Sequence, residues 1–189
     1  MRKLIVCLLP CFCLVAFAAP SPFAELRGYV EARVASIAGS TDKHEAAEWK
    51  ALTKALGYIV EADAISLGMP VGPPTVDSIP DFLDFAALLP KAAAGIEKSE
   101  TPDADILGSV ATLHTFFTFF HGWIGYKFDE IIAGLPAKDQ AKIIVARAKA
   151  EDVMGVGETQ WSNGDWGAAT KTFAKAVKSL AKLLVKYSA

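Results

Sequence analysis

The chain has 189 residues, of which 52% are hydrophobic and 21% are charged, and its formal net charge is −2 at pH 7. All three cysteines, Cys7, Cys11 and Cys13, lie near the start, so the rest of the chain cannot contain a disulfide framework. Without Arg2 and Lys3 the 19 basic residues fall to 17 against 21 acidic ones. This acidic balance argues against general nucleic-acid binding.

Residues 1–18 have the features of a secretory signal peptide. Arg2 and Lys3 precede an uncharged run that ends at Phe17, and Ala16-Phe17-Ala18 provides a small-x-small cleavage site. We expect cleavage after Ala18, because Pro20 disfavours cleavage one residue later. The protein would then be secreted or periplasmic, and residues 19–189 would form one domain held by core packing.

Two amphipathic helices are predicted next, joined by residues 39–41 into an antiparallel hairpin. Apolar residues at helical spacing mark the first helix, which stops near Gly39: Phe23, Leu26, Val30, Val34 and Ile37. The spacing from Asp42 to Glu45 is that of a capping box, which begins the second helix. That helix carries Trp49, Leu52, Leu56, Ile59 and Ile65.

Residues 68–80 contain four prolines and two glycines, which predicts a segment without regular structure. We interpret it as a surface crossover between helices, with a rigid wrap or a hinge as the alternatives. A short helix over residues 80–89 should end or kink at Pro90 and resume weakly over residues 91–99.

The longest predicted helix runs from Thr101 to Ala133, and the remaining helices are expected to pack around it. It has no formal charge between Ile106 and Tyr126. Its apolar residues recur every three or four positions, and a second apolar row widens the arc beyond that of a surface helix. Polar residues in the middle and acidic flanks favour a buried core helix over a membrane span.

A ligand pocket is predicted beside this helix, because its apolar arc exceeds what two-layer packing requires and pockets form between bundle helices. The candidate residues are His114, Phe116, Phe117, Phe120, His121 and Trp123. Two helical turns separate the two histidines by about 10 Å, too far for both to bind one metal ion. A single histidine as a haem ligand is the alternative to histidines hydrogen-bonded within the bundle. We expect no cofactor and no metal.

Two helices are predicted at the C-terminus, one opening at Pro136 and fraying at Gly155-Val156-Gly157, and one over residues 165–186, with a turn at Asn163-Gly164. The spacing of Gly157, Gly164-Asp165, Ala169, Phe173 and Ala176 resembles one tetratricopeptide unit of roughly 34 residues, from Ala150 to Leu183. Gln160 and Ala181 depart from its aromatic and proline positions. The resemblance implies peptide or protein binding, and an ordinary hairpin is the alternative.

One face of the last helix carries five lysines: Lys171, Lys175, Lys178, Lys182 and Lys186. An amphipathic helix with such a face can lie on an anionic membrane or polymer. Lysines near a helix C-terminus also interact favourably with the helix dipole, so a solvated face is the alternative.

No catalytic motif is apparent. His44-Glu45 lacks the second histidine of a zinc protease, and no Gly-x-Ser-x-Gly elbow is present. No segment alternates apolar and polar residues as a strand would. We therefore predict an all-α, single-domain bundle of five to seven helices that is not an enzyme.

The expected function is that of an exported, non-catalytic binding protein, which carries an apolar small molecule beside the aromatic-rich helix. The alternatives are a protein-interaction module that uses the tetratricopeptide-like C-terminal hairpin, and peripheral membrane or anionic-polymer binding through the lysine face.

Overall fold

The computed structural model describes residues 23–68, 74–99 and 104–188. These contain six α-helices and no strand, which confirms the all-α prediction: α2 (Ala24–Ser36), α3 (Lys43–Gly68), α4 (Ile79–Glu97), α5 (Ala104–Ile131), α6 (Ala137–Ser162) and α7 (Trp166–Ser188). Two 3-10 turns, η1 (Val76–Ser78) and η2 (Ile132–Gly134), precede α4 and follow α5. The predicted signal peptide, residues 69–73 of the 68–80 crossover and the Thr101 cap lie outside the described residues. The prediction that the crossover lacks regular structure was wrong at its end, where η1 forms and α4 begins at Ile79, because Pro80 is compatible with the first turn of a helix.

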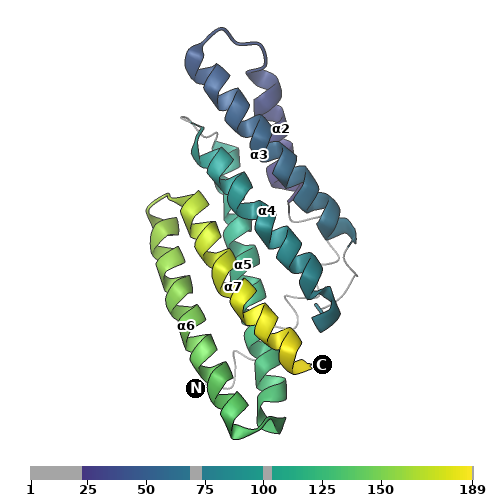
Figure 1. Ribbon diagram of the computed structural model, residues 1–189. Coiled ribbons are helices and arrows are strands. Elements are labelled where there is room, and N and C mark those ends of the chain that lie inside the picture. Colours follow the sequence, from purple (N-terminus) through teal and green to yellow (C-terminus); the bar gives the residue numbers. More distant parts are fainter. Residues whose placement is uncertain (1–22, 69–73, 100–103, 189) are drawn as a thin grey trace, which may run out of the picture.

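The helices form an elongated bundle (Figure 1). Helix α3 packs against α2 and α4, and α4 packs in turn against α7. Helix α7 also contacts α5 and α6, so it lies between three neighbours. Helix α5 contacts α2, α4 and α7. The interior of the bundle is therefore shared by α4, α5 and α7 and is not centred on α5 alone.

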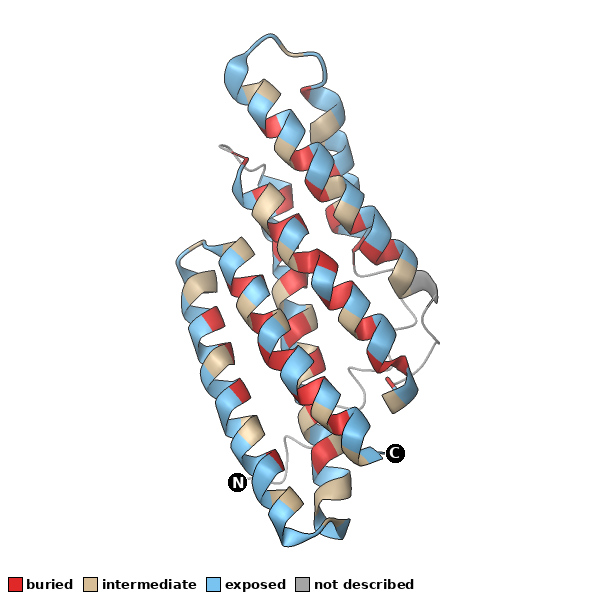
Figure 2. Cartoon of the chain, viewed as in Figure 1, coloured by how far each residue is buried: buried red, intermediate tan, exposed pale blue. Residues whose placement is uncertain are grey.

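The predicted apolar row of α5 is buried. Ile106, Leu113, Phe117, Phe120 and Ile124 have no exposed surface, and Figure 2 shows buried residues along the inward faces of the helices. The expectation that α5 would be covered on most sides was wrong. Its outer side is exposed at small residues, Gly108, Ala111, Thr115, Thr118 and Gly122, and also at the large apolar side chains of Leu107 and Tyr126. Among the described helices, none combines the length and the hydropathy that crossing a membrane requires.

The sequence predicted that the α4 segment would end or kink at Pro90 and that α6 would fray at Gly155-Val156-Gly157, and neither helix ends at these positions. Helix α4 runs through Pro90, although this residue supplies no N–H to the carbonyl four positions earlier. Leu89 and Ala92 on either side of Pro90 are buried, so packing against α3 and α7 offsets the missing bond. Helix α6 likewise runs through Gly155 and Gly157 without fraying.

The predicted α2–α3 hairpin is present, and arginine–carboxylate pairs join its two helices. Arg33 donates from Nε to Oε1 of Glu48 at 3.0 Å and from Nη2 to Oε2 at 2.9 Å. Arg27 donates to Asp63 at 3.2 Å. Glu48 and Asp63 are both buried, so these charge-assisted bonds join α2 to α3 beside the buried apolar contacts of Leu26 and Val30.

Candidate functional site

Three of the six pocket candidates, Phe116, Phe120 and Trp123, pack against rings of α4. The Phe116 and Phe85 ring centroids are 4.4 Å apart, and those of Phe120 and Phe82 are 4.7 Å apart. Trp123 and Phe120 stack at 5.8 Å. Such spacings are those of directly contacting aromatic rings. These side chains therefore contribute to the core between α4 and α5.

The other three candidates face α6 and α7. Phe117 is fully buried, with its ring centroid 5.8 Å from that of Phe173. His114 Nε2 lies 2.8 Å from Oε2 of Glu158, and its ring is 5.1 Å from that of Trp161. His121 is half-buried, and this burial lowers the pKa of its imidazole. The structure thus distributes the six candidates over two helix interfaces.

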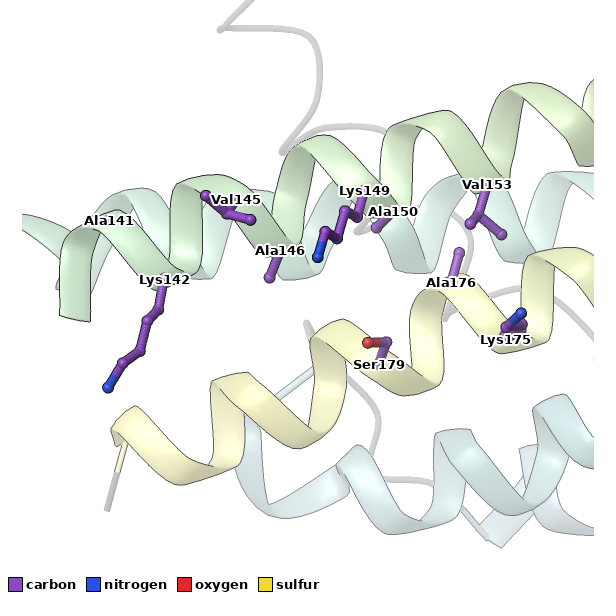
Figure 3. Close-up of a pocket in the computed structure, with 10 residues that line it drawn as sticks. All are labelled: Ala141, Lys142, Val145, Ala146, Lys149, Ala150, Val153, Lys175, Ala176 and Ser179. Atoms are coloured by element: carbon purple, nitrogen blue, oxygen red, sulfur yellow. The ribbon is translucent and has the colours of Figure 1, made fainter. Parts of the chain in front are cut away.

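A surface groove of about 510 Å³ lies between α6 and α7, away from the six predicted pocket residues. Apolar and small side chains line most of it, with lysines beside them: Ala141, Lys142, Val145, Ala146, Lys149, Ala150, Val153, Lys175, Ala176 and Ser179. Figure 3 shows Ala150, Val153 and Ala176 where the two helices face each other. Val145 is 52% exposed, so the groove is open to solvent.

The antiparallel pairing of α6 and α7 creates this groove. Gly164 has φ +85° and allows the tight turn between them, as the sequence predicted. At the turn end Gly157 admits the ring of Phe173, which brings the helices close together. Towards the other end the facing residues Ala150 and Ala176 are small, so part of the space between the helices is left unfilled.

The charged residues that line the groove are all lysines: Lys142 and Lys149 from α6 and Lys175 from α7. Lys142 contacts Oδ1 of Asp139 at 2.8 Å. The pKa of the Asp139 carboxyl is lowered, mainly by this hydrogen bond and also by the hydroxyl of Tyr187. The groove therefore combines an apolar floor with a positive border.

The predicted lysine row of α7 is exposed on the side opposite the buried residues. Only Lys175 of this row lines the groove. Lys186 lies 5.4 Å from the centroid of the Tyr187 ring. Within the described part of the chain, no ion pair involves Lys171, Lys175, Lys178 or Lys182.

Sequence reasoning missed the contribution of α6 to this site. Lys142 and Lys149 are seven residues apart, which places them on one side of a helix. Val145 lies between them, and its exposure shows that this side of α6 is not core. That spacing was a usable signal, but only the structure shows that this side of α6 adjoins Lys175.

The described residues contain no group of three or more metal-ligating side chains. The fold is an all-α helical bundle, and a groove lies on its C-terminal hairpin. No family model, curated protein or solved structure matches the chain.

Proposed function

We propose that this protein is a non-catalytic binding protein that holds a protein partner on the face formed by α6 and α7. The observation that carries this proposal is the groove, whose floor is apolar and whose charged residues are all basic. Clefts between the helices of a bundle that are lined mainly by apolar side chains are common binding sites. The part of this hairpin from Ala150 to Leu183 resembles a tetratricopeptide unit, and that resemblance also implies protein binding, although the groove extends beyond it to Ala141.

An apolar carrier has less support. Enclosed pockets bury most of a small ligand, whereas the aromatic candidates contact one another and the groove is open. Phe116 and Phe120, for example, both contact rings of α4. An open groove suits a partner with a large surface of its own.

The test is partner binding by two matched variants. A partner isolated from the producing cells by affinity capture is purified and titrated against the wild-type chain and against Val145→Glu. We expect Val145→Glu to abolish binding, because it places a carboxylate in the apolar groove. Val60→Glu is the control, since Val60 is an exposed valine on α3 and lies outside the groove. Unchanged binding by Val145→Glu would exclude this face.

A second candidate function is binding to an anionic membrane or polymer. The specific observation is the α7 row, where Lys171, Lys178 and Lys182 are exposed outside the groove. Each lysine near an anionic bilayer contributes about 1 kcal/mol of attraction. Replacing these three lysines by glutamine should then release the protein from anionic vesicles in a sedimentation assay, and unchanged sedimentation would argue against this candidate.

A further inference from the structure

We infer that the partner of the α6–α7 groove is an amphipathic helix whose apolar stripe is bordered by carboxylates. This inference rests on the proposed protein-binding function and specifies the chemistry of the partner. It follows from four properties of the groove: its charge, its backbone, its length and the small side chains of its floor.

The charge of the groove favours an acidic partner. Lys142 and Lys149 border it on α6, Lys175 borders it on α7, and no aspartate or glutamate lines it. Lys149 and Lys175 take part in no ion pair within the described residues, whereas Lys142 is already paired with Asp139. Carboxylates on a bound partner would meet these ammonium groups, whereas a basic partner would be repelled.

The backbone of the groove favours a helical partner over an extended one. The N–H and C=O groups along α6 and α7 bond within each helix, so they offer no ladder to an added strand. The only neutral polar side chain in the lining is Ser179. An extended segment would find few hydrogen-bond partners for its backbone in this lining, whereas a helix satisfies its backbone internally.

The length of the groove and the positions of its lysines predict where the acidic residues of the partner helix lie. Its α6 side extends from Ala141 to Val153, about 18 Å at 1.5 Å per residue. Lys142 and Lys149 are two turns apart, roughly 10 Å. A partner helix aligned with α6 should therefore carry acidic residues at positions i and i+7 on one flank. An acidic residue on its other flank would face Lys175, with apolar residues at helical spacing between the flanks.

Small side chains on the floor suit a helix in particular. A third helix could approach closely at Ala146, Ala150 and Ala176, because these side chains are small. Its apolar side chains would then pack between those of α6 and α7, as in other helix–helix interfaces. A flat bilayer surface cannot enter such a concave site. The groove therefore favours a helical protein segment over a membrane.

Three synthetic helices of about 15 residues, long enough to span the groove, test the inference by fluorescence anisotropy. The first has a leucine stripe flanked by glutamates, the second replaces each glutamate by lysine, and the third has the composition of the first with the stripe scrambled. Each is titrated against the wild-type chain, the groove variant Lys142→Glu/Lys149→Glu/Lys175→Glu and the control variant Lys171→Glu/Lys178→Glu/Lys182→Glu. The two variants change the net charge equally, and circular dichroism checks that both are folded.

We expect the acidic amphipathic helix to bind the wild-type chain and the control variant alike. The groove variant should weaken this binding by at least about tenfold, since three exposed charge pairs become repulsive. The basic amphipathic helix should bind only the groove variant, and the scrambled helix should bind none of the three.

If the acidic helix bound the groove variant as tightly as it binds the wild-type chain, the inference would be overturned, because the three lysines would then play no part in recognising the helix. Preference of the wild-type chain for the basic helix would also overturn it, but would leave protein binding at this face intact. Binding of neither helix would overturn the inference, whereas the titration of Val145→Glu decides separately whether a protein partner binds this face.

Discussion

Gly157 of α6 lies against the ring of Phe173 of α7, and a Cβ atom added at Gly157 would overlap that ring. Phe173 is fully buried, and its ring also approaches those of Phe117 and His114. The contact therefore joins three helices, α5, α6 and α7. It explains why a glycine occupies the interior of a long helix.

Gly157→Ala should lower the free energy of unfolding by about 1 kcal/mol. Overpacking against a confined ring costs about 1–3 kcal/mol, and the better helix propensity of alanine offsets part of it. The control is Gly155→Ala in the same helix, where a Cβ would meet no atom within 4 Å. That control should raise stability by about 0.5–1 kcal/mol. Urea denaturation measures both, and stabilisation by Gly157→Ala would contradict the packing described.

Gly95→Ala should be more harmful, about 2 kcal/mol, because it separates α4 from α3. A Cβ at Gly95 would stand 2.7 Å from Cβ of Ala55 and 3.0 Å from the carbonyl oxygen of Ala51. Neither of these atoms can move without shifting α3. Gly57→Ala is the control, since Gly57 lies on α3 with open space around it. Equal urea midpoints for the two variants would show that α3 and α4 are not closely packed at Gly95.

Arg33→Met should destabilise the protein by about 1–3 kcal/mol, because it leaves the Glu48 carboxylate buried without the two bonds that Arg33 donates. Adding Glu48→Leu to Arg33→Met should recover most of this loss, since both polar groups are then removed together. A double-mutant cycle by urea denaturation measures the coupling.

The matched control for this cycle is the exposed pair Lys127–Glu130, whose atoms are 2.7 Å apart on α5. Exposed ion pairs contribute little, so Lys127→Met should change the unfolding midpoint much less than Arg33→Met. The same cycle applied to Lys127 and Glu130 gives the coupling energy of an exposed pair. A coupling energy between Arg33 and Glu48 as small as that value would contradict the conclusion that Arg33 compensates a buried carboxylate.

His121 should make the fold less stable in mild acid. Burial is the main cause that lowers the pKa of His121 in the folded protein, the Arg147 charge lowers it further, and the Glu151 charge opposes both. The unfolded chain, with a histidine pKa of about 6.5, then binds the proton first. The contribution of His121 to stability is therefore present above pH of about 6.5 and is lost as the pH falls towards its lower folded pKa.

The measurement is the unfolding midpoint at pH 7.5 and pH 5.5 for the wild-type chain and His121→Gln. The variant should lose less stability on acidification than the wild-type chain does. His44→Gln is the control, because His44 is exposed at the start of α3. An identical pH response of wild type and His121→Gln would show that His121 is not shielded from solvent.

The local residue pattern was enough to predict most helices. Apolar spacing identified the buried row of α5, and Gly164 identified the turn before α7, because periodicity and positive φ are properties of a few neighbouring residues. The same reasoning did not show that α4 continues past Pro90 and that α6 continues past Gly157. There the cost of a proline or a glycine is local, but the contacts that offset it come from other helices.

The chain by itself determined that the protein is helical and that α7 carries a row of exposed lysines. Only the tertiary structure decided which surfaces remain open. The rings of α5 contact those of α4 and α7, whereas Ala150 and Ala176 leave space beside Val145 and Lys149. The reason is that the size of a gap depends on side chains from two helices, and their pairing cannot be read from the periodicity of either one.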